Sequence, residues 1–198
     1  AAGHLAWVNS KALEMMKINR ETPDPPYGEI ARDEQGEPTG ILYENAIALA
    51  KEAFQLPVDR RERIFRQFLQ STARLGVTSL SDMFPLPAIE LGDLEMYQSF
   101  EEKGQLTTRI HFLTGLDGDL TQAKRLRDAH QSGTLQFSGL KQFLDGVVTA
   151  QTACLVEPYA DRSEFRGEVP FSREQLTEWV EEADREGFRI RFHAVGDG

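Results

Sequence analysis

The segment RIRFHAVGDG, residues 189–198, brings a histidine to the end of a β-like run and follows it with a turn. Arg191 and His193 fall on one face of that run, because side chains alternate along a strand. In α/β proteins, ligands and metals bind at the carboxyl ends of parallel strands. His193 is therefore a candidate functional residue if the strands that precede it are parallel.

From about residue 59 onward the sequence alternates between helical and β patterns. Asp59 is expected to cap the first helix, and Ser172 with Gln175 forms a capping box for the last. The expected helices cover residues 59–75, part of 88–103, about 119–131 and 172–187, and the expected strands cover 77–82, 107–113, 139–145 and 189–193. Such alternation with short links predicts βαβ units and a parallel sheet.

Two features favour half of a (β/α)8 TIM barrel over a small doubly wound sheet. Lys141, Phe143 and Asp145 share one face of their strand, so polar groups line that side of the sheet. The loop over residues 146–171 is long, and the functional loops of a barrel follow its strands. A doubly wound sheet would show near-continuous Val and Ile runs, and neither a G-x-G-x-x-G nor a Walker sequence is present.

Residues 1–58 follow a different pattern. A short helix is expected over residues 9–18, with Asn9 or Ser10 as its cap, and a proline cluster follows at 23–26. Two β-capable runs, 29–33 and 39–44, flank a glycine-containing turn and predict a hairpin. We therefore expect a small α+β segment over residues 1–58 and a partial barrel over 59–198.

Composition limits the partners of the chain. The formal net charge of −10 argues against nucleic acid and anionic membranes, because no basic stripe could neutralise phosphates. No apolar run has transmembrane length and no signal-peptide pattern is present, so a cytoplasmic protein is expected. The single cysteine, Cys154, excludes an internal disulfide and a cysteine-rich zinc site.

Two residues on the polar face of the expected sheet are candidates for chemistry, and each has alternatives. His193 could bind a divalent metal or act as a base, or its ring could be satisfied by a backbone carbonyl. Asp197 could orient the His193 ring, or it could be only a residue that the Gly196-Asp197-Gly198 turn requires. Lys141 could reach the surface, pair with Asp145, or react with carbon dioxide to give a carboxylate-like metal ligand.

A series of motifs resembles the YtcJ-like branch, amidohydrolase family 3, of the amidohydrolase superfamily. The series is HLAWVNSKAL (4–13), TPDPP (22–26), GEPTGILYE (36–44), GVTS (76–79) with Asp82, LKQFLDG (140–146) with Thr152 and Ala153, and HAVGD (193–197). The motifs cover essentially the whole chain, and their order is more specific than any one of them.

The resemblance implies a metal-dependent hydrolase on a (β/α)8 barrel that uses metal-activated water to hydrolyse amide-type C–N bonds in a small molecule. It places Lys141, often carboxylated in this family, and His193 as ligands of one or two divalent ions, expected to be zinc, on the fourth and fifth strands. Residues 1–58 would be inserted between the first and second strands. The residues expected near the substrate are His4, Trp7, Asn9, Asp82 and Asp145.

The family's remaining ligands and its proton-carrying aspartate have no counterpart in this sequence, so no catalytic residue is assigned. The chain would be a fragment over about strands two to five, inactive by itself, and its open sheet edges would favour a homo-oligomer. One alternative is a binding or regulatory protein that keeps the barrel without a complete metal centre. Another is a complete, monomeric ligand-binding domain.

Overall fold

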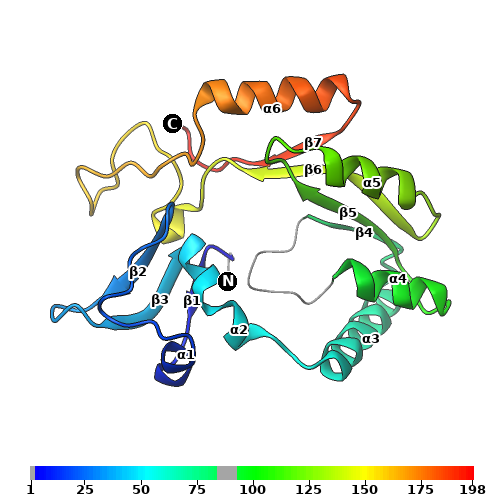
Figure 1. Ribbon diagram of the computed structural model, residues 1–198, viewed down its shortest axis with the longest axis horizontal. Coiled ribbons are helices and arrows are strands. Elements are labelled where there is room, and N and C mark those ends of the chain that lie inside the picture. The colour runs from blue at the N-terminus through cyan, green and yellow to red at the C-terminus, as the bar shows by residue number, and fades with distance from the viewer. Residues whose placement is uncertain (1–2, 84–92) are drawn as a thin grey trace.

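The computed structural model describes residues 3–83 and 93–198, and contains two β-sheets (Figure 1). The first sheet is antiparallel with the order β1-β3-β2, and the second is parallel with the order β4-β5-β6-β7. The strands are β1 (Leu5–Trp7), β2 (Gly28–Arg32), β3 (Pro38–Glu44), β4 (Ser79–Asp82), β5 (Arg109–Gly115), β6 (Leu135–Phe143) and β7 (Ile190–His193).

The helices follow from their caps and apolar faces. Asn9, Asp93 and Ser172 each accept a hydrogen bond from the backbone N–H three residues along, which fixes the starts of three helices. The α-helices are α1 (Ser10–Met15), α2 (Lys51–Phe54), α3 (Val58–Arg74), α4 (Leu94–Glu102), α5 (Thr121–Ala129) and α6 (Arg173–Arg185), and short 3-10 turns cover Asn45–Ala50 and Val148–Ala150.

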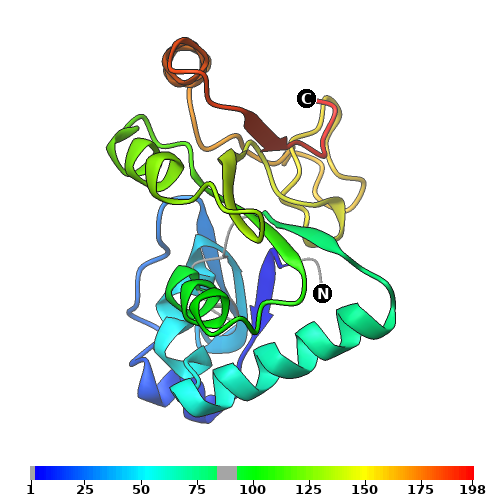
Figure 2. The same ribbon diagram turned by 90° about the vertical axis from the view of Figure 1, so that its right-hand side faces the viewer.

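The expected parallel sheet is confirmed, with its strands adjacent in the order of the sequence. The sheet curls, and helices α4, α5 and α6 lie on its outer side, as in half of a (β/α)8 barrel (Figures 1 and 2). The long loop between β6 and α6 descends from the carboxyl end of the sheet toward β2 and β3 (Figure 1). The carboxyl ends of β6 and β7 therefore face the antiparallel sheet.

Several boundaries differ from those expected. Asp59 does not cap α3: the helix begins at Val58 after Pro57, and Asp59 lies in its first turn, where a carboxylate still favours the helix dipole. Strand β6 begins at Leu135 rather than 139, because its first residues pair with β5. Strand β1 was not expected, since three residues carry no periodic signal. Residues 88–92 of the second expected helix lie outside the described residues.

Each sheet has its own hydrophobic core. The parallel sheet packs Ile110, Leu135 and Leu140 against residues of the outer helices such as Phe65 and Phe100. The smaller core lies between α1, the antiparallel sheet and the turn that follows it, and contains Val8, Ile18, Ile30, Leu42, Ala46 and Ala50. Both cores consist of side chains that are almost completely buried, so each sheet is held by its own helices.

Gly139 lets β7 approach β6 closely. Its φ of +132° is unfavourable for other residues, and a Cβ at this position would collide with the carbonyl oxygen of Arg189. That carbonyl accepts the hydrogen bond of Leu140 N at 2.8 Å, at the start of the β6–β7 pairing. The position therefore controls where β7, and with it His193, sits on the sheet.

We expect Gly139→Ala to lower the free energy of unfolding by about 2 kcal/mol, because the methyl group forces the two strands apart. Urea denaturation followed by circular dichroism measures the effect. Gly133→Ala is the matched control, since a Cβ there meets nothing within 4 Å. Equal stability of the two variants would contradict this account of the β6–β7 contact.

Candidate active site

Three rings meet where the carboxyl ends of β6 and β7 approach the antiparallel sheet. His193, the last residue of β7, lies opposite Phe143 in the strand register, and the centres of their rings are 5.2 Å apart. His4, which precedes β1, lies on the other sheet, and its ring centre is 4.8 Å from that of His193. Residues far apart in the sequence are thus brought together around His193.

Lys141 is buried on the same face of β6 as Phe143. Its side chain is only 5% exposed, and its Nζ lies 3.6 Å from the centre of the Phe143 ring. Nζ donates a hydrogen bond to the carbonyl of Gln142 at 3.0 Å, and over residues 3–83 and 93–198 it forms no ion pair. Burial lowers the pKa of the Lys141 amine to about 8. Lys141 therefore neither reaches the surface nor pairs with Asp145.

The ring of His193 is oriented by the loop that follows β6. Its Nε2 lies 2.9 Å from the carbonyl oxygen of Gly146. Because a carbonyl only accepts, Nε2 carries the hydrogen, and a neutral ring then keeps its lone pair on Nδ1. Metal-binding histidines commonly have one ring nitrogen held in this way. Asp197 does not orient the His193 ring, since its carboxylate instead accepts a hydrogen bond from Val156 N.

Asp145 fastens three segments of the chain at this end of the sheet. Its carboxylate accepts hydrogen bonds from the backbone N–H groups of Val195, Gly196 and Cys154 at 2.9, 2.7 and 3.0 Å. Burial raises the pKa of this carboxyl, but these three donors outweigh burial and hold the pKa below its usual value. Asp145 thus joins the end of β6 to the following loop and to the turn after β7.

Glu44 holds His4 in place. The Nδ1 atom of His4 lies 2.9 and 3.0 Å from the two carboxylate oxygens of Glu44, and His4 is 5% exposed. Glu44 has φ +47° and ψ −123°, a conformation that costs a residue other than glycine about 1–3 kcal/mol. Sequence reasoning missed Glu44, because only the pairing of β1 with β3 brings it to His4.

The other residues expected near the substrate differ in their roles. Trp7 is 82% exposed and lines a cavity together with His4. The side chain of Asn9 caps α1, and the carboxylate of Asp82 accepts a hydrogen bond from the Tyr97 hydroxyl at 2.7 Å. Burial, and then the Asp82 charge, raise the pKa of that hydroxyl. The structure therefore gathers Lys141, His193 and His4 around Phe143 and places Trp7 at the cavity that His4 lines, whereas Asn9 caps its own helix.

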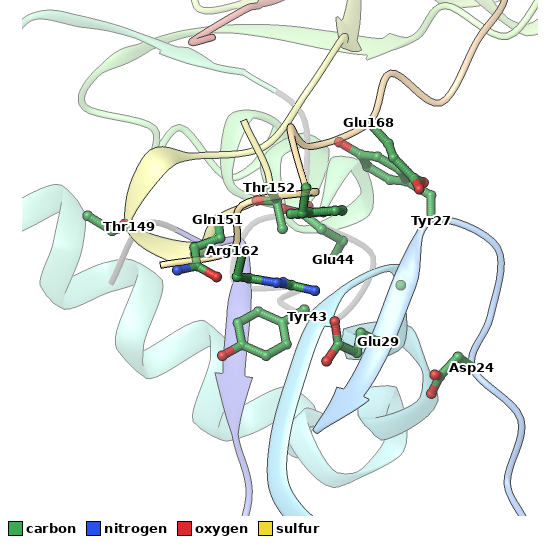
Figure 3. A pocket seen from close by; sticks show the side chains of 13 residues that line it. Asp24, Tyr27, Glu29, Tyr43, Glu44, Thr149, Gln151, Thr152, Arg162 and Glu168 are labelled. Carbon is green, nitrogen blue, oxygen red and sulfur yellow. The ribbon is translucent and has the colours of Figure 1, made fainter. Parts of the chain in front are cut away.

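Two cavities border this region. The first, of about 550 Å³, lies between the antiparallel sheet, which contributes Glu29 and Tyr43, and the loop after β6, which contributes Gln151 and Arg162 (Figure 3). The second, of about 540 Å³, is bordered by His4 and Phe143 and so opens beside His193. Both have the size typical of small-molecule sites.

Two of the described residues at this end of the sheet could take part in binding a metal. His193 has an imidazole nitrogen of the kind that zinc accepts, whereas the Lys141 amine could donate a lone pair only after losing its proton. A catalytic zinc usually has three protein ligands, and the described part of the chain contains no group of three or more His, Cys, Asp or Glu residues that could hold a metal.

None of the helices described is long and apolar enough to cross a bilayer.

The sequence matches known proteins along its whole length. The model of the amidohydrolase family matches residues 1–198. Protein LONG AFTER FAR-RED 3 of Arabidopsis thaliana is 32% identical, over 98% of this chain and 35% of that protein. Putative amidohydrolase YtcJ of Bacillus subtilis is 28% identical, over 98% of this chain and 37% of that protein. The chain thus spans little more than a third of the length of these relatives.

A solved structure shares the fold. The crystal structure of an uncharacterized metal-dependent hydrolase from Pyrococcus horikoshii superposes with a TM-score of 0.65 at 27% identity. The match covers 98% of this chain and 38% of the archaeal one. The sequence motifs and the three-dimensional arrangement therefore agree on the same group of proteins.

We expect Asp145→Asn to lower the free energy of unfolding by about 2 kcal/mol at pH 7, because an amide replaces the charged acceptor of three backbone donors. The folded-state pKa of Asp145 is lowered, so its contribution is complete above the usual carboxyl pKa and is lost as the pH falls through the folded-state value.

Chemical denaturation at pH 7 and at successively lower pH measures this difference between Asp145→Asn and wild type. The difference should shrink as the pH falls, and Asp117→Asn, in an exposed turn, should change stability little at either pH. A difference that grows toward acid would contradict the assignment.

Proposed function

The chain belongs to the amidohydrolase family, and we propose that it forms part of a metal-dependent hydrolase that cleaves amide-type C–N bonds in small molecules. One observation carries the proposal: Lys141, buried with a lowered pKa, and His193, with its ring fixed, lie at the carboxyl ends of neighbouring parallel strands. That is the end of a barrel sheet where catalytic groups gather.

Lys141 and His193 would hold the metal in this proposal. His193 fits through Nδ1, because Nε2 is bonded to the Gly146 carbonyl. Lys141 fits because a pKa of about 8 leaves part of its amine neutral near pH 7, and the lone pair of a neutral amine can form an N–C bond to carbon dioxide, releasing one N–H proton to water and leaving an anionic, carboxylate-like ligand. The further ligands would come from parts of the full-length protein beyond these 198 residues, which would then correspond to about strands two to five.

A divalent metal at this position, which we propose is zinc, would polarise the substrate carbonyl and make water acidic enough to react near pH 7. The residues of this chain contribute positioning. Asp145 holds the loop whose Gly146 carbonyl orients His193. Phe143 packs against both Lys141 and His193 and so restricts where their side chains can lie.

The test uses the full-length protein. Elemental analysis of the purified protein should find a divalent metal, and Lys141→Ala and His193→Ala should each lower the bound metal and reduce amide hydrolysis by at least about 1,000-fold. Lys11→Ala, which removes an exposed lysine that pairs with Glu14, should leave both properties unchanged.

Two results would contradict the proposal. A folded protein that hydrolyses amides equally well after both substitutions would show that these residues hold no catalytic metal. A folded full-length protein that binds no metal would favour a binding or regulatory protein that keeps the barrel without the metal centre.

A further inference from the structure

We propose that the cavity beside His193 selects uncharged amides that carry an aromatic or similarly bulky apolar substituent, and rejects those whose substituent carries a carboxylate. The inference rests on the proposed function, because it places this substituent next to the metal ligands. A metal centre alone does not determine which class of amide the protein accepts, and the cavity would make that selection.

The walls of the cavity are mainly apolar. The large apolar side chains that line it include Leu5, Trp7, Ile47, Phe54, Phe143 and Phe171. Several of them are exposed where they meet solvent, with Trp7 at 82%, Leu5 at 39% and Phe54 at 38%. A ligand that covers these surfaces gains the hydrophobic effect, and a flat ring also gains edge and face contacts with the aromatic walls.

The charges around the cavity disfavour an anionic substituent. None of the described residues that line it is a lysine or arginine, and its acidic residue is Glu44, whose side chain is 12% exposed. The amine of Lys141 packs on Phe143 but does not line the cavity. A carboxylate in this space would lose its hydration near another carboxylate, and His4, which also lines the cavity, is already paired with Glu44.

The cavity contrasts with its neighbour. The first cavity is lined by Arg162 together with Asp24, Glu29 and Glu168, so charged side chains border it (Figure 3).

Tyr27 lines both cavities, and its buried hydroxyl has no hydrogen-bond partner among the described residues. Burial, and then the Glu44 charge, raise the pKa of this hydroxyl, so it stays a neutral donor that suits an uncharged carbonyl.

The cavity also has the right position. The rings of His4 and Phe143, which line the cavity, have their centres 4.8 and 5.2 Å from the ring centre of His193. A substrate whose substituent fills the cavity and whose amide bond lies next to His4 and Phe143 would therefore have that bond near His193. The cavity thus lies beside one of the two candidate metal ligands.

The experiment compares three amides that differ only in their substituent: N-benzylacetamide, N-methylacetamide and N-(4-carboxybenzyl)acetamide. Calorimetry with the full-length protein measures affinity independently of turnover, and kcat/KM is measured on the same preparation. We expect N-benzylacetamide to bind at least about tenfold more tightly than N-methylacetamide and about 100-fold more tightly than the carboxylate. The same order is expected in kcat/KM.

A charge introduced into the cavity gives the matched variant. Ala48 lines the cavity and is exposed, so Ala48→Arg should fold normally and supply the missing cation. It should shift the preference at least about tenfold toward N-(4-carboxybenzyl)acetamide. Ala73→Arg places the same charge on the exposed surface of α3, away from the lining residues, and should leave the preference unchanged.

The failures of the two proposals can be told apart. Binding with the expected preference but without hydrolysis supports the cavity assignment and counts against the amidase activity. Hydrolysis of all three amides at similar kcat/KM, with similar affinities, overturns the cavity assignment while the amidase activity stands. Absence of binding by N-benzylacetamide also overturns the assignment, because it means that other parts of the protein fill the cavity.

Discussion

The geometry of the site depends on the hydrogen bonds that the carboxylate of Asp145 accepts. It stands just beyond the end of β6 and accepts backbone hydrogen bonds from the loop after β6 and from the turn after β7. Asp145 is only 4% exposed, so these bonds to a charged acceptor are shielded from water and are stronger than bonds between neutral groups. Together with the hydrogen bond from Gly146 N to the Thr152 carbonyl, they hold the loop whose Gly146 carbonyl orients His193.

The two sheets depend on each other at the same place. Gly146 packs so closely against Thr152 and the Glu44 carboxylate that a side chain would not fit there. Glu44 belongs to the antiparallel sheet and holds His4, whereas Gly146 follows the parallel sheet and contacts His193. A strained backbone at Glu44 is maintained at this junction, as strained residues often are where function requires a fixed geometry. The small sheet thus forms one wall of the site rather than a separate attachment.

The sequence allowed a large part of the fold to be predicted, because helices and strands leave local signals. The Ser172 cap was predicted from the Ser172–Gln175 pair, Asn9 was one of two candidates for the first cap, and the order of helices and strands led to the parallel sheet. Strand β1 and the start of β6 could not be predicted, since both exist only through pairing with a distant strand. The prediction that Asp59 caps α3 was wrong, because acidic residues are favoured in the first turn of a helix as well as at its cap.

For the site, position in the sequence singled out Lys141 and His193 but not their surroundings. The packing of Lys141 on Phe143 and the pairing of His4 with Glu44 are contacts between strands, and no residue pattern encodes them. The most direct test of the account is anomalous diffraction at the metal edge from crystals of the full-length protein. It should place a divalent ion about 2.0–2.1 Å from His193 Nδ1, with the Lys141 side chain turned toward the ion. A metal bound elsewhere, with Lys141 Nζ still lying on the Phe143 ring, would contradict it.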